Sequence, residues 1–93
     1  MALARAHVIV HGIVQGVGFR YSTVREAEER NLAGWVRNTY EGNVEAVFEG
    51  EKDDVDDMVA WCRRGPVSAE VSKVDVAWEE PQKPSFKSFT IRY

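Results

Sequence analysis

A glycine-containing turn between a strand and a helix constrains the fold of this chain more than any other segment. The run Gly-Ile-Val-Gln-Gly-Val-Gly-Phe-Arg occupies residues 12–20. Before and into this run, residues 6–14 alternate between a small apolar face and a mixed face, which is the period of a strand with one face in the core. After Arg20 the apolar residues fall near one helical stripe. Gly16 and Gly18 therefore predict a tight turn from strand to helix.

The same turn has the features of an anion site. Successive backbone N–H groups that lead into a helix N-terminus form an electropositive concavity. Arg20 adds a permanent cation with a bidentate fork, and neither of its sequence neighbours is acidic. The glycine spacing matches neither a P-loop nor a dinucleotide-binding fingerprint. The composition of the loop alone fits a turn without a ligand about as well, and Arg20 favours a phosphate or acyl-phosphate site.

The remaining segments predict an α+β fold. The first helix begins either near Phe19 or at Thr23, which has capping-box spacing to Glu26, and Asn31 and Gly34 close it. A hairpin follows, with strands over 34–38 and 43–48, and Gly50 ends it. A second helix has an apolar stripe, its first turn is acidic, its last turn contains Arg63 and Arg64, and Gly65 and Pro66 stop it; the stripe consists of Val55, Met58, Val59 and Cys62.

Two more strands complete the chain, one over 71–78 with an irregularity after Val71 and a short one over 89–93. The order is β-α-β-β-α-β plus a short C-terminal strand. It predicts a ferredoxin-like split βαβ sandwich, with two helices on one face of an antiparallel sheet.

Size and charge limit the classes of function. Ninety-three residues predict one domain over residues 1–93 with a single modest core. The 12 Lys and Arg against 15 Asp and Glu argue against a nucleic-acid binder, and no apolar run is long enough for a membrane span. A lone Cys62 cannot form an internal disulfide, so the cytoplasm is the expected compartment. We expect a monomer.

Several other polar residues have an ordinary structural explanation beside a chemical one. Asn38 ends a strand before a turn, where a turn-forming Asn is common, but its amide can also hold a water in line with a phosphorus atom. His7 and His11 share the mixed face of the first strand, which favours exposed structural roles, with His11 the better candidate base because it borders the loop. Cys62 fits a small core residue, and the aspartates of residues 53–57 fit an acidic helix start, because their spacing matches no calcium loop.

Two long segments resemble the signatures of the acylphosphatase family. Residues 12–20 resemble the family's phosphate-cradle signature. Residues 34–50, Gly-Trp-Val-Arg-Asn-Thr-Tyr-Glu-Gly-Asn-Val-Glu-Ala-Val-Phe-Glu-Gly, resemble its second signature. Gly65 and Pro66, followed by Ala69 and Val71, resemble its helix-to-strand junction, so the resemblance covers essentially the whole chain.

The resemblance implies hydrolysis of the carboxyl-phosphate bond of a small acyl phosphate to a carboxylate and inorganic phosphate, with no metal or other cofactor. It implies that Asn38 orients the attacking water in line with the phosphorus, and that Arg20 binds the phosphoryl group together with the loop amides. The loop residues assigned to substrate binding are Gln15, Gly16, Val17, Gly18, Phe19 and Arg20.

Three alternatives stay open at this point. The same cradle could serve a non-catalytic anion-binding module, although the presence of both Arg20 and Asn38 argues against it. An RNA-binding domain would have a basic and aromatic motif on its central strands, which residues 7–11 lack. Related domains also occur in larger enzymes that handle carbamoyl phosphate, but the chain looks complete at both ends, so a stand-alone enzyme is expected. The sequence does not identify the acyl group.

Overall fold

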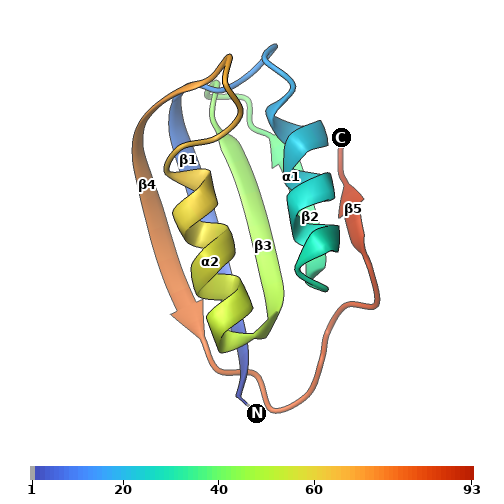
Figure 1. Ribbon diagram of the computed structural model, residues 1–93. Helices are drawn as coiled ribbons and strands as arrows, with labels where there is room; N and C mark the ends of the chain where they lie inside the picture. Colours follow the sequence, from blue (N-terminus) through green and yellow to red (C-terminus); the bar gives the residue numbers. More distant parts are fainter. Residues whose placement is uncertain (1) are drawn as a thin grey trace.

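Two helices cover one face of a five-stranded sheet in the computed structural model, which describes residues 2–93 (Figure 1). The strand order across the sheet is β4-β1-β3-β2-β5. This arrangement confirms the predicted α+β, ferredoxin-like fold. The elements are β1 (Leu3–Ile13), α1 (Phe19–Glu29), β2 (Ala33–Asn38), β3 (Val44–Glu51), α2 (Lys52–Cys62), β4 (Glu70–Glu79) and β5 (Phe89–Ile91).

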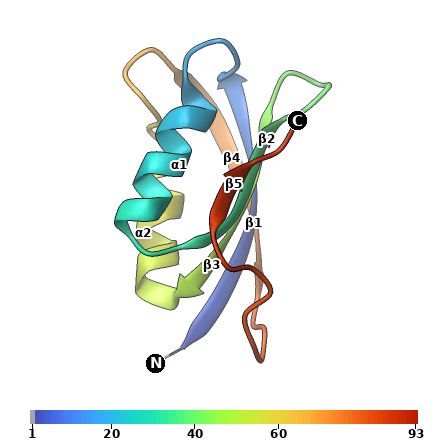
Figure 2. The ribbon, with the colours of Figure 1, turned by 90° about the vertical axis from the view of Figure 1, so that its right-hand side faces the viewer.

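The sheet is antiparallel except at one edge. β1 pairs antiparallel with β3 and β4, and β3 pairs antiparallel with β2. β5 pairs parallel with β2, with Val36 opposite Ile91, so the complete sheet is mixed rather than wholly antiparallel. The reason is the connection after β4, which crosses from one edge of the sheet to the other and brings β5 in with the direction of β2. Figure 2 shows this connection on the side of the sheet opposite the helices.

The alternation in β1 places its small apolar side chains in the core. Ala6, Val8 and Val10 are completely buried against the helices. The predicted irregularity after Val71 is confirmed, because the pairing of β1 with β4 shifts register between His11 and Gly12. β3 runs on to Glu51 rather than ending at Gly50, since its ladder with β1 continues to the last residues of the strand.

Helix α1 begins at Phe19, the earlier of the two expected starts. Thr23 lies inside the helix, where its buried hydroxyl donates a 2.7 Å hydrogen bond to the Phe19 carbonyl oxygen. Asn31 has the left-handed φ of 56° that ends a helix, as expected. No helix among residues 2–93 has the length and apolar character needed to cross a membrane.

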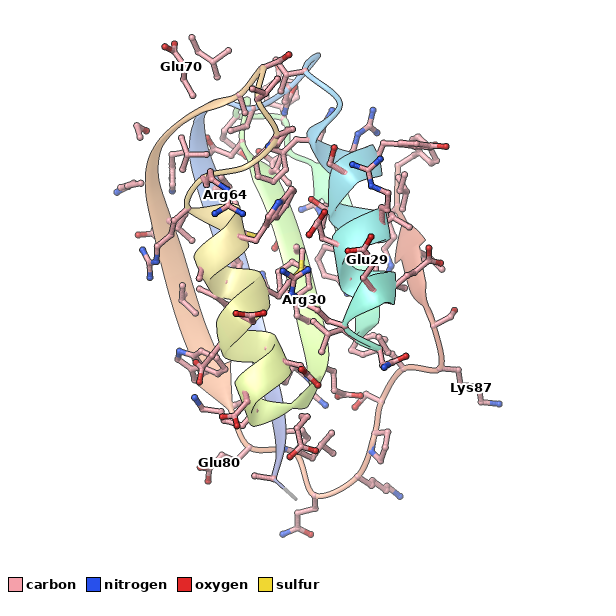
Figure 3. The ribbon with its side chains drawn as sticks, in the orientation of Figure 1. Glu29, Arg30, Arg64, Glu70, Glu80 and Lys87 are labelled. Atoms are coloured by element: carbon pink, nitrogen blue, oxygen red, sulfur yellow. The ribbon has the colours of Figure 1, made fainter. Side chains whose placement is uncertain are left out.

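Helix α2 buries its predicted apolar stripe and is tied to α1 by one arginine. Arg63 and Arg64 lie just beyond its last residue instead of in its last turn. Arg30, between the two helices in Figure 3, pairs with Glu26 at 2.9 Å and Asp57 at 3.4 Å. Cys62 is buried, and desolvation raises the pKa of its thiol to about 12. Cys62 is therefore the core residue that the sequence predicted.

A buried carboxylate anchors the connection between β4 and β5 on the outer face of the sheet. The side chain of Glu49 is 2% exposed. Its Oε1 accepts hydrogen bonds from the backbone N–H groups of Ser85 at 2.7 Å and Phe86 at 3.3 Å, and its Oε2 accepts one from Arg5 Nε at 3.0 Å. Arg5 also contacts Glu79 at 2.7 Å and Ser85. This cluster fixes the route by which the chain reaches β5.

We expect Glu49→Ala to destabilise the protein by about 1–3 kcal/mol, because it removes a buried carboxylate and leaves two partly buried backbone donors and part of the Arg5 guanidinium without this acceptor. Chemical unfolding of the variant measures this loss. Glu80→Ala is the matched control, since Glu80 points away from the protein in Figure 3 and should change stability by less than about 0.5 kcal/mol. Equal stability of the two variants would show that Glu49 does not anchor the connection.

Candidate active site

The loop after β1, the end of β2 and the end of β5 meet at one end of the sheet. Figure 1 shows the end of β5 beside the start of α1. These segments surround a hollow of about 210 Å³. Of the residues predicted for the site, five line the hollow: Gly16, Gly18, Phe19, Arg20 and Asn38.

The backbone of the turn requires its two glycines. Gly16 and Gly18 have φ angles of 74° and 75°, in the left-handed region that side chains disfavour. A Cβ atom at either position would meet nothing within 4 Å, so the conformation, and not the space, demands glycine. The turn thus leaves bare backbone open to the hollow.

The start of α1 makes this end of the hollow electropositive. The first helical hydrogen bond runs from the Ser22 N–H to the Gly18 carbonyl oxygen at 3.0 Å. The N–H groups of the first turn that precede Ser22 have no intrahelical acceptor, and this turn contains no acidic side chain. With the positive end of the helix dipole added, the arrangement suits an anion.

Arg20 supplies a cation that no carboxylate neutralises in the described chain. The arginines that form ion pairs within residues 2–93 are Arg5, Arg30 and Arg37. The Arg20 guanidinium instead lies 5.5 Å from the centre of the Tyr93 ring. A ring face attracts a cation without cancelling its charge. Arg20 is therefore held in place while its donors stay available to an anion.

Asn38 brings an unsatisfied acceptor to the same hollow. It is the last residue of β2 and lies opposite Val44 of β3. Its Oδ1 atom is buried and accepts no hydrogen bond from any residue between 2 and 93. A buried acceptor without a partner costs about 1–3 kcal/mol. The position therefore favours a donor from outside the protein, such as a water molecule.

Gln15 and Val17 do not line the hollow. Gln15 Nε2 donates hydrogen bonds to the carbonyl oxygens of Thr39 and Asn43, both at 2.8 Å. These carbonyls belong to the hairpin that follows Asn38, so the Gln15 side chain fastens the turn to that hairpin. Val17 packs against the core. Their side chains therefore position the loop, and only their backbone N–H groups stay candidates for a ligand.

The two histidines lie on the outer face of the sheet, away from the hollow. His7 Nε2 is 2.6 Å from Glu45 Oε2, and His11 Nε2 is 2.8 Å from Asp75 Oδ2. Burial alone would raise the pKa of Glu45, but hydrogen bonds from His7 and Arg37 outweigh it and lower the pKa. These carboxylate partners come from neighbouring strands, so no local spacing in the sequence announces them.

Sequence reasoning missed four residues that line the hollow. They are Val14, which follows β1 and is buried, and Tyr21, Ile91 and Tyr93. The period of the last strand predicted that Ile91 and Tyr93 share a face, but no local signal places this strand parallel to β2. Tyr21 follows Arg20 directly, but nothing in its residue type or position marks it in the sequence as a site residue. The hollow thus has a positively charged floor, to which Arg20 contributes, and an aromatic rim.

The arrangement can hold a tetrahedral anion and one water molecule. Backbone N–H groups and Arg20 supply donors for the anion, and Asn38 supplies an acceptor for the water. Among residues 2–93, no three His, Cys, Asp or Glu side chains gather in a way that could hold a metal ion. Two aspartates of the acidic segment 53–57 form ion pairs with different partners: Asp56 with Lys52, and Asp57 with Arg30.

Comparisons with known proteins agree on one family. A family model described as acylphosphatase matches residues 6–91. An acylphosphatase of Nostoc sp. is 61% identical over 80 residues, which cover 86% of this chain and 79% of that protein. An acylphosphatase of Pelotomaculum thermopropionicum is 46% identical over the full length of both chains. The crystal structure of acylphosphatase from Bacillus subtilis superposes with a TM-score of 0.91 at 36% identity, over 97% of this chain and 99% of that one.

We expect Gln15→Ala to weaken the binding of inorganic phosphate and to lower stability by about 1–2 kcal/mol, because the two hydrogen bonds that fasten the turn to the hairpin are lost, although each carbonyl oxygen keeps a backbone donor. Titration calorimetry with phosphate and chemical unfolding measure the two effects. Gln82→Ala, in the exposed connection after β4, is the control and should change neither. Unchanged phosphate affinity in Gln15→Ala would show that the turn keeps its shape without this side chain.

Proposed function

The chain belongs to the acylphosphatase family, and from this we propose that the protein hydrolyses acyl phosphates to a carboxylate and inorganic phosphate at the hollow beside α1. One observation carries the proposal: an arginine and a buried amide oxygen, neither of which has a polar partner among residues 2–93, line the same hollow. The first suits a phosphoryl group, and the second suits the water that attacks it.

In this proposal the phosphoryl group binds at the turn. The N–H groups of residues 15–20 and the Arg20 guanidinium donate hydrogen bonds to its oxygens. A guanidinium meets two phosphate oxygens at once, which fixes orientation as well as charge. Because phosphoryl transfer depends mainly on positioning and charge stabilisation, these donors supply most of what the reaction needs.

Asn38 positions the nucleophile. Its Oδ1 accepts a hydrogen bond from a water molecule and turns an oxygen lone pair of that water toward the phosphorus, opposite the acyl oxygen. The new bond joins the water oxygen to phosphorus, and the bond between phosphorus and the acyl oxygen breaks. One water proton passes to a phosphate oxygen, and the leaving group departs as a carboxylate.

This route needs no side chain that acts as a general acid or base. A carboxylate is stable at neutral pH and departs without protonation, and the substrate's own phosphate oxygens accept the water proton. The positions of His7 and His11 on the outer face support this proposal. The sparse set of polar residues around the hollow is what the reaction requires.

The partners follow from the same site. The groups that the proposed mechanism uses, namely the turn amides, Arg20 and Asn38, all belong to this chain, and on this ground we propose that a monomer is active. The hollow is small and its rim holds no row of cations, which supports a small-molecule substrate over a nucleic acid. A cytoplasmic location remains part of the proposal, because Cys62 is a buried free thiol of the kind that a reducing compartment preserves.

We expect the purified protein to hydrolyse benzoyl phosphate in the presence of a chelator, and Asn38→Ala to lower kcat by at least about 10²–10³ while inorganic phosphate still binds. Asn43→Ala is the control, since Asn43 lies on the same hairpin but outside the hollow. Near wild-type turnover by Asn38→Ala would remove the water-positioning role. No turnover by the wild type, with phosphate still bound in a titration, would leave an anion-binding module and overturn the enzymatic proposal.

Arg20→Lys should lower kcat/KM by about tenfold or more, and Arg20→Ala should lose both turnover and phosphate affinity, because a point charge does not reproduce the bidentate contact. Steady-state kinetics and phosphate titration check this result. Arg25→Lys is the control, because Arg25 is exposed on the same helix and away from the hollow. Wild-type kinetics in Arg20→Lys would show that charge alone suffices.

A further inference from the structure

The hollow is more apolar than a phosphate requires. Hydrogen-bond donors lie at the floor of the hollow, but Tyr21, Ile91 and Tyr93 also line it. The two tyrosines are among the most exposed large side chains of the molecule, at 76% and 100% of their full accessible area. Single exposed aromatic residues are ordinary, but two that share one hollow with an unpaired arginine suggest a ligand with an apolar part.

The three residues approach the hollow from two elements. Tyr21 follows Arg20 on α1, and Ile91 lies opposite Val36 of β2, two residues before Asn38. The Tyr93 ring stands 5.5 Å from the Arg20 guanidinium. Figure 1 shows the end of β5 close to the first turn of α1. A group that extends from a phosphate bound at Arg20 therefore emerges beside these side chains.

We propose that Tyr21, Ile91 and Tyr93 form an acyl subsite, and that the protein favours acyl phosphates with a flat, apolar acyl group, such as an aromatic one, over small or polar acyl groups. This inference rests on the proposed function. The acyl carbon is separated from phosphorus by a single bridging oxygen, so anchoring the phosphoryl group fixes where the acyl substituent lies. Tyrosine rings offer flat apolar faces of matching shape.

A small polar acyl group gains little from this rim. A methyl group covers a small part of a ring face, and a carbamoyl group exposes an amide that needs hydrogen-bond partners. The apolar side chains here offer such partners only through the tyrosine hydroxyl groups. Because the rim is open to solvent, we expect a moderate preference, of about tenfold or less.

Tyr21 is the better probe of the subsite. The Tyr93 ring also contacts Arg20, so removing it would disturb phosphate binding and acyl binding together. Ile91 belongs to a strand of three residues, and its truncation would disturb the pairing of β5 with β2. Tyr21 lies on a helix whose own hydrogen bonds stay intact when the side chain is shortened.

The test compares kcat/KM for benzoyl phosphate and acetyl phosphate in the wild type, Tyr21→Ala and Tyr21→Phe. The two substrates differ in intrinsic reactivity, but this difference cancels when the ratio in a variant is divided by the ratio in the wild type. We expect Tyr21→Ala to lower the ratio by about two- to fivefold, and Tyr21→Phe to keep it because the ring face remains. Tyr40→Ala is the control, since Tyr40 is fully exposed on the hairpin outside the hollow.

A binding measurement separates acyl recognition from chemistry. Calorimetry with benzylphosphonate and methylphosphonate, which cannot be hydrolysed in this way, should show a loss of affinity in Tyr21→Ala for the benzyl compound alone. If Tyr21→Ala changed neither the ratio of kcat/KM for benzoyl phosphate over acetyl phosphate nor the ratio of the affinities for the two phosphonates, the acyl subsite would be overturned and the enzymatic proposal would stay intact. Failure of the wild type to hydrolyse either substrate would instead refute the proposed function, and the subsite with it.

Discussion

The site depends on one side chain, Gln15, that links two parts of the site on strands that are not neighbours in the sheet. The turn that leads to Arg20 follows β1, and Asn38 ends β2, but β3 lies between these strands. Two strand spacings place the ends of β1 and β2 about 10 Å apart, which is too far for direct contact. Gln15 reaches from the turn to the carbonyls of Thr39 and Asn43 in the hairpin that joins β2 to β3. The distance between the anion-binding turn and Asn38 is therefore set by a rigid ladder of strands and by a pair of hydrogen bonds.

A site with so few polar groups needs them to be held firmly, and the start of α1 shows how. Phe19, the first helical residue, is 2% exposed, and its ring lies 5.4 Å from that of Trp61 on α2. Gly65 approaches the same ring so closely that a Cβ there would lie 2.6 Å from Phe19 Cε2. Because the Phe19 ring packs between Trp61 and Gly65, the core fixes the backbone position of the adjacent residue Arg20. Packing thus performs the positioning that other sites obtain from additional polar residues.

Residues whose surroundings are local could be predicted from the sequence, and residues whose surroundings are distant could not. The period of β1, the stripe of α2 and the glycine turn each depend on neighbours within a few positions, and their predicted elements agree with the structure. Glu49 shows the opposite case. Its parity in β3 places it on the outer face, where a charged residue is expected to be exposed, yet the connection after β4 covers it. Likewise, the Gln15 hydrogen bonds and the parallel pairing of β5 form between segments far apart in the chain. Patterns of a few neighbouring residues therefore cannot predict them.

The two halves of the hollow differ in how firmly the fold holds them. The positively charged floor is held by the packing of Phe19 in the core and by the hydrogen bonds of Gln15 to the hairpin. The rim on β5 rests on a strand of three residues, bonded to β2 at its ends by Gly34 N–H to Ser88 O at 3.0 Å and Arg92 N–H to Val36 O at 2.8 Å. Such a short edge strand adds little stability by itself, so its position depends on the Glu49 cluster on the outer face and on Phe89, which is buried in the core and stacks on Phe48. Rigid donors beside a less constrained apolar rim fit a reaction in which the phosphoryl group is constant and the acyl group varies.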